Sequence, residues 1–99
     1  MSYIESVKYI DWDPQKNEQL KNERGVSFEE VIEAIFGDGL IIILEHPNKK
    51  KYGNQKIFIV ELHEYAYLLP YVEDAEKIFL KTVFPSRKHT KIYIEKGNI

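Results

Sequence analysis

The residues of this chain that could do chemistry gather towards its C-terminal end. Six of them carry a positive charge or a transferable proton: Lys81, Arg87, Lys88, His89, Lys91 and Tyr93. Cleavage of RNA without a metal needs a base for the 2′-hydroxyl proton, a cation for the pentacoordinate phosphorane, and an acid for the leaving 5′-oxygen. Lysine, arginine, histidine and tyrosine can fill these roles. The alternative is a solvated basic surface, in which Tyr93 packs and Lys81 extends its stem along the sheet.

If the C-terminal segment from Arg87 is helical, the spacing of these residues brings some of them together. Ser86 is a suitable cap for a helix that begins at Arg87. Such a helix places His89 and Tyr93 one turn apart. Residues 90–94 have strand propensity instead. We expect a short C-terminal helix.

Other catalytic and metal-binding signatures are absent from the sequence. It contains no Gly-rich phosphate loop, no His-Glu-x-x-His pair and no Gly-x-Ser-x-Gly elbow. The histidines His46, His63 and His89 lie on separate expected loops or element ends, so we expect no metal and no cofactor. The absence of cysteine excludes disulfides, thiol catalysis and Cys-based zinc sites, and it suits a reducing cytosol.

The charges are divided unevenly along the chain. Residues 1–48 hold ten acids and four bases (4 − 10 = −6), and residues 49–99 hold ten bases and six acids (10 − 6 = +4). A cationic stripe on an otherwise acidic protein fits a phosphate-binding surface. A solvated face, or a docking face for an acidic partner, is the alternative.

The length and composition predict one domain over residues 1–99. With 43% hydrophobic residues, a chain of 99 residues can bury a core without disulfides. The N-terminus carries Glu5 where a signal peptide needs an apolar run. The longest apolar stretch, Leu40–Leu44, is far shorter than the roughly 20 residues that span a bilayer. We expect a cytoplasmic protein that does not contact a membrane.

Two helices are expected in the N-terminal half, after a short strand at residues 6–12. Asp13 and Pro14 favour the start of a polar helix that ends near Gly25. Ser27 and Glu30 form a capping box for the best-defined helix, at about residues 27–37, which has one apolar stripe.

The middle of the chain is rich in strand signals. We expect a buried strand at 40–45 and further strands at 57–62, 65–73 and 78–84. His63 and Glu64 would form a tight hairpin turn. Pro70 predicts a bulge or an edge, since it cannot donate to a neighbouring strand. The fold class is therefore α+β: an antiparallel sheet of about four strands, with two N-terminal helices and a short C-terminal helix packed on it.

Two segments resemble a known family. Ile10–Asn17, with its Trp-Asp-Pro and a lysine, and Arg24–Glu30, with Gly-Val-Ser-Phe-Glu-Glu, resemble the opening of BrnT-like toxins of the RelE/ParE superfamily. Glu45 after a strand and the pair Ser86-Arg87 match more loosely. The chain departs from these typically basic toxins in its sequence pI of about 5.9.

The resemblance implies a RelE-like fold and a toxin of a bacterial toxin–antitoxin system, a ribonuclease that arrests translation by cutting RNA, free or ribosome-bound. It also implies a cognate antitoxin, often of ribbon-helix-helix type. In that setting Arg87 matches the arginine that closes the last strand, and Lys16 matches a first-helix lysine. The candidate catalytic residues are Arg87, Lys81, His89 and Tyr93, and the candidate RNA-phosphate-binding residues are Lys16, Lys88 and Lys91.

Two other functions remain open at this point. The chain could be a non-catalytic module whose basic stripe receives an acidic antitoxin tail. It could also be a DNA-acting relative, because a cationic stripe does not distinguish RNA from DNA and only contacts to the 2′-hydroxyl do so.

Overall fold

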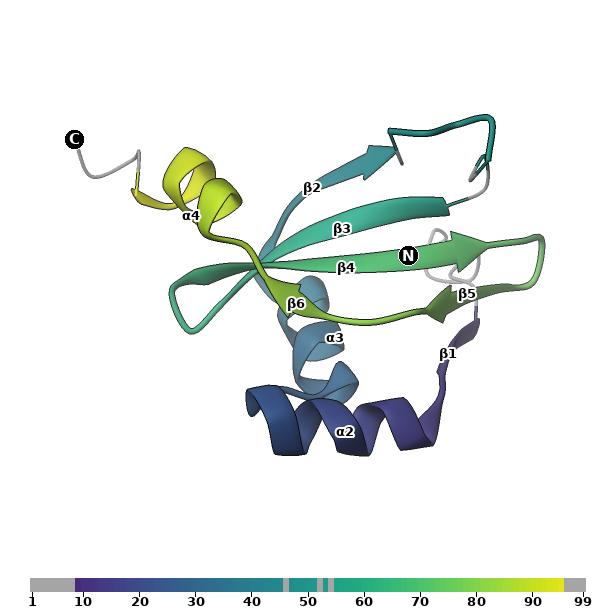
Figure 1. The fold of residues 1–99 in the computed structure, drawn as a ribbon, viewed down its shortest axis with the longest axis horizontal. Helices are drawn as coiled ribbons and strands as arrows, with labels where there is room; N and C mark the ends of the chain where they lie inside the picture. Colours follow the sequence, from purple (N-terminus) through teal and green to yellow (C-terminus); the bar gives the residue numbers. More distant parts are fainter. Residues whose placement is uncertain (1–8, 46, 52, 54, 96–99) are drawn as a thin grey trace.

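A computed structural model describes residues 9–45, 47–51, 53 and 55–95. Its elements are β1 (Tyr9–Trp12), α2 (Pro14–Arg24), α3 (Phe28–Phe36), β2 (Leu40–Glu45), β3 (Gln55–Leu62), β4 (Tyr65–Glu73), β5 (Lys77–Leu80), β6 (Phe84–Pro85) and α4 (Arg87–Tyr93) (Figure 1). Residues 6–8 of the expected first strand, and His46, lie outside the described residues. None of the helices in the described part is long and apolar enough to cross a membrane.

The fold is α+β, as expected, but its sheet differs from the expectation. Its strands lie in the order β1-β5-β4-β3-β2, and β6 also pairs with β4, which makes six strands. β1 runs parallel to β5, whereas the other pairs are antiparallel. The expected sheet of about four antiparallel strands is therefore wrong. Most of the chain lies between β1 and its partner β5 in the sequence, so no local pattern predicts that these two strands pair.

Helices cover the two faces of the sheet unequally. α2 and α3 lie on one face, which we call the α2/α3 face, and α4 lies on the other, the α4 face (Figure 1). The larger core fills the α2/α3 face and contains Leu20, Val26, Phe28, Val31, Phe58, Val60, Leu69, Tyr71, Leu80 and Val83. A smaller core on the α4 face contains Ile59, Ala66 and Leu68. The single short helix α4 leaves part of its face uncovered.

The corner between α2 and α3 follows the sequence signals closely. The Asp13 side chain accepts a hydrogen bond from the backbone N–H of Gln15, and Gly25 ends α2 with a φ of 70°. The Ser27 hydroxyl accepts from the Glu30 N–H and caps α3. Both helices were predicted because such caps satisfy backbone donors within a few residues.

A buried amide joins the two helices. The Asn17 Oδ1 accepts a hydrogen bond of 2.8 Å from the backbone N–H of Phe28, and its Nδ2 donates one of 2.7 Å to Glu29. Asn17 is buried, and both of its polar atoms are satisfied. This role of Asn17 was not predicted, since the polar residues of α2 are typical of a surface helix.

The strand expected to be buried, β2, lies at the edge of the sheet. Its register against β3 shifts between Leu40 and Ile42, and Leu40, Ile42 and Ile43 are exposed. An apolar, β-branched run does not distinguish an edge from a central position, so the expectation of burial was wrong.

The single strand expected at 78–84 is broken into β5 and β6. Ile78 and Leu80 pack in the core on the α2/α3 face, whereas Phe84 packs against the core on the α4 face. Because residues 81–83 are not in a strand, the alternation of side chains is reset between the two pieces. The expectation of one strand at 78–84 is therefore wrong.

The same break explains Pro70. It lies inside the central strand β4, and its carbonyl accepts from the N–H of Lys81. The carbonyl and the nitrogen of a strand residue point to the same side, so the missing N–H faces the gap between β5 and β6, where no strand needs it.

The hairpin turn is where the sequence placed it. His63 and Glu64 connect β3 to β4, with φ values of 56° and 63°. Two successive residues with positive φ match the twist of the flanking strands. This conformation is costly for residues with a Cβ.

Candidate functional site

Helix α4 is attached to β4 by one buried side chain. The Thr90 hydroxyl donates a hydrogen bond of 2.7 Å to the Ser86 carbonyl and accepts one of 2.8 Å from the backbone N–H of Ala66. Thr90 is 2% exposed and Ala66 is fully buried. The helix predicted from Ser86 is therefore confirmed, and its orientation on the sheet is fixed by Thr90, which the sequence analysis did not single out.

His89 is held by its neighbours on α4. Its Nδ1 lies 2.6 Å from the Ser86 Oγ, which also accepts from the His89 backbone N–H. Its ring stacks on Tyr93, with 6.2 Å between centroids and an angle of 7° between planes. Burial, and to a smaller extent the charge of Lys88, lower the pKa of His89. The imidazole is therefore largely neutral at pH 7, with Nδ1 engaged by Ser86.

Three cations lie on the same helix as this histidine. Arg87, Lys88 and Lys91 are exposed, and none of them forms an ion pair within the described part of the chain. Arg87 and Lys91 are one turn apart, as expected. These residues can receive an anion because no described carboxylate neutralises them.

Lys81 lies on the same face but apart from α4. Its backbone N–H bonds the carbonyl of Pro70, one residue beyond the paired Tyr71 and Leu80, so Lys81 lies opposite Pro70. Tyr71 packs in the core on the α2/α3 face, so Pro70 and the Lys81 opposite it lie on the α4 face. The backbone N–H of Lys81 bonds Pro70 and that of Ser86 bonds Ala66. These β4 positions are four residues, or roughly 13 Å, apart. Lys81 and Arg87 thus belong to a row of cations and not to one pocket.

Lys16 does not belong to this surface. It lies on α2, which packs on the opposite face of the sheet from α4 (Figure 1). A ligand on α4 is separated from Lys16 by the sheet. The resemblance grouped Lys16 with Lys88 and Lys91, and the structure separates them.

The uncovered part of the α4 face carries residues that the sequence analysis missed. Phe79 and Lys77 point to this face, because Ile78 and Leu80 point to the other. The Lys77 Nζ lies 5.9 Å from the centre of the Phe79 ring and 3.6 Å from the Asp11 carboxylate. The alternating pattern Lys77-x-Phe79-x-Lys81 could have predicted that these three side chains share a face. It places an aromatic ring between two lysines.

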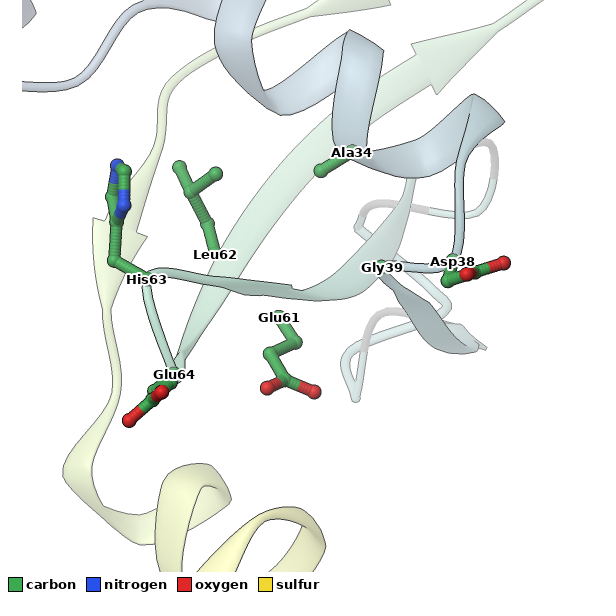
Figure 2. Close-up of a pocket in the computed structure, with 7 residues that line it drawn as sticks. All are labelled: Ala34, Asp38, Gly39, Glu61, Leu62, His63 and Glu64. Atoms are coloured by element: carbon green, nitrogen blue, oxygen red, sulfur yellow. The ribbon is translucent and has the colours of Figure 1, made fainter.

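The other end of α4 is acidic. A depression of about 320 Å³ between α3 and the β3–β4 hairpin is lined by Ala34, Asp38, Gly39, Glu61, Leu62, His63 and Glu64 (Figure 2). A neighbouring one of about 600 Å³ is lined by Glu61, Glu64, Tyr93, Ile94 and Glu95. Their carboxylates repel phosphate. Among the described residues no group of three or more His, Asp or Glu side chains could hold a metal ion. On the α4 face, the anion-receptive surface is therefore formed by Arg87, Lys88 and Lys91 of α4 and by the adjoining sheet, away from these depressions.

In comparisons with known proteins, the chain matches no family model, no curated protein and no solved structure.

Proposed function

We propose that this chain is the toxin of a bacterial toxin–antitoxin system, a cytoplasmic ribonuclease that needs no metal and blocks translation by cutting RNA. One observation carries the proposal: a largely neutral histidine, held by Ser86, shares helix α4 with three exposed cations that no described carboxylate neutralises. The resemblance of residues 10–17 and 24–30 to BrnT-like toxins supports the same class.

The roles follow from the chemistry of the side chains. In the tautomer of neutral His89 whose Nδ1–H donates to the Ser86 Oγ, Nε2 carries a lone pair, and this lone pair takes the proton of the 2′-hydroxyl. The Arg87 guanidinium, always charged, stabilises the phosphorane. Tyr93, stacked on His89, is the candidate acid for the leaving oxygen. Lys88 and Lys91 bind the flanking phosphates.

The uncovered sheet face supports single-stranded RNA as the substrate. Unstacked bases bind aromatic rings, and cations along the same path bind the backbone. Phe79 offers a ring on this face, and Lys81 lies between Phe79 and α4. In this role Lys81 holds a neighbouring phosphate and does not touch the reacting one, since its backbone is about 13 Å from the start of α4 along β4.

The test is cleavage of single-stranded RNA, with and without ribosomes. Arg87→Ala should reduce the cleavage rate about a hundredfold or more, the usual effect of losing one transition-state donor. Arg24→Ala is the matched control, because Arg24 is the only other arginine and lies on α2, across the sheet. Equal cleavage by the wild type and Arg87→Ala would remove Arg87 from the mechanism.

The second candidate is a non-catalytic module that binds an acidic antitoxin segment. It is favoured by the separation of Lys81 from Arg87, which suits an extended acidic peptide as well as a nucleic acid. An antitoxin of ribbon-helix-helix type would be the partner. Harmless overexpression without that partner, together with no RNA cleavage, would favour this module. Cleavage of DNA in place of RNA would identify a DNA-acting relative.

A further inference from the structure

Four of the seven exposed large apolar side chains that the structure describes lie at one edge of the sheet, and the other three are Tyr9 on β1 and Ile92 and Tyr93 on α4. Among the described residues, Phe36 is 65% exposed, Ile43 47%, Ile42 37% and Leu40 36%. All four lie on β2 or at the adjoining end of α3. Contiguous apolar surface of this kind marks an interaction site, whereas single exposed apolar residues do not.

The backbone of this edge is open for pairing. β2 ends the strand order β1-β5-β4-β3-β2, so within the described part of the chain the hydrogen-bonding groups on its outer side have no strand beside them. Proteins usually protect such edges with proline or with charged side chains in the strand. Leu40–Leu44 contains neither. The register shift lies at the start of the strand, and pairing from Ile42 to Glu45 is regular.

Both faces of the edge are apolar. Leu40 and Ile43 pair with Val60 and Phe58, whose side chains belong to the α2/α3-side core. Ile42 pairs with Ile59, which belongs to the α4-side core. A strand added here must therefore be apolar on both faces. β2 itself meets this requirement.

We propose that a second copy of this chain pairs with the first through β2, antiparallel, about a two-fold axis near Ile43. Residues opposite each other in a sheet share a face. The axis therefore sets Ile43 against Ile43 of the second copy and Ile42 against its Leu44. Phe36, at the end of α3, adds to the contact on the α2/α3 face.

The charges at the two ends of β2 are complementary in this arrangement. Asp38 precedes the strand and Lys50 follows it, and neither has an ion pair within the described residues. Antiparallel pairing brings Asp38 of each copy towards Lys50 of the other. Glu45, the one charge within β2, already pairs with Lys49 of its own chain. The interface therefore buries no uncompensated charge.

The mass of the particle in solution tests this proposal. Sedimentation of the wild type over a concentration series should give twice the mass of the chain. Ile43→Lys should give the mass of one chain, because it sets two lysines against each other at the axis. Ile92→Lys is the matched control, since Ile92 is similarly exposed at 43% but lies on α4. Circular dichroism verifies that both variants fold.

A cross-link tests the register independently. The chain has no cysteine, so Ile43→Cys introduces a single thiol. Opposed residues have Cβ atoms roughly 5 Å apart, close enough for a disulfide between copies. Oxidation should convert Ile43→Cys to a covalent dimer much faster than Ile92→Cys. A wild type that sediments as one chain at every concentration would overturn the proposal, as would an Ile43→Lys dimer or equal cross-linking of the two cysteine variants.

Discussion

Replacing Thr90 by valine should detach α4 from the sheet while almost preserving the volume of the side chain. The substitution removes the hydroxyl that donates to the Ser86 carbonyl at 2.7 Å and accepts from the Ala66 N–H at 2.8 Å. Ala66 is fully buried, so its N–H has no access to water once the hydroxyl is lost. A buried donor without a partner costs about 1–3 kcal/mol, and the second lost hydrogen bond adds about 1 kcal/mol.

The expected loss is therefore about 2–4 kcal/mol of the free energy of unfolding, a large share of the roughly 5–15 kcal/mol of a typical domain. Urea unfolding followed by circular dichroism measures it, provided that the slope of the transition is unchanged. Thr90→Ser is the matched control. It keeps the hydroxyl and loses only one methyl group, at a cost of about 1 kcal/mol.

Comparing the stabilities of Thr90→Val and Thr90→Ser tests whether the hydroxyl holds α4. If Thr90→Val is no less stable than Thr90→Ser, the hydroxyl does not hold α4 and the reasoning is refuted. In the proposed ribonuclease, Thr90→Val should also reduce cleavage at temperatures where the domain is still folded, because α4 carries His89 and Arg87.

Three further predictions concern other parts of the molecule. Burial lowers the pKa of His89, so the unfolded chain binds a proton at this histidine more readily than the folded chain does. The free energy of unfolding should therefore fall as the pH drops below about 6.5. His89→Gln should remove that part of the pH dependence of the urea midpoint. Asn17→Ala leaves the buried N–H of Phe28 without an acceptor, which should cost about 1–3 kcal/mol in the same assay. Glu64→Gly relieves the strain of a φ of 63° and should stabilise the hairpin by about 0.5 kcal/mol. Glu61→Gly is the control, because Glu61 lies in regular strand, where glycine should destabilise the hairpin. Destabilisation by both variants would contradict this account.

The candidate site was only partly predictable from the sequence. The helix from Arg87, its Ser86 cap and the neighbourhood of His89 and Tyr93 follow from residues three or four positions apart, so a local pattern contains them. The place of Lys77 and Phe79 beside α4 depends on which face of β5 is buried. Lys16 was assigned to the site through a resemblance, and the sheet lies between it and α4.

The amino-acid sequence by itself determined the three helices, the hairpin at His63 and the α+β class, because caps, turn residues and apolar spacing act over a few residues of chain. Only the tertiary structure decided that β1 runs parallel to β5 and that the apolar strand β2 lies at an edge. Strand order depends on contacts between segments far apart in the chain, and the same β-branched run satisfies a central or an edge position locally. The packing of α2 and α3 on one face, and of α4 on the other, decides which charged side chains share a surface.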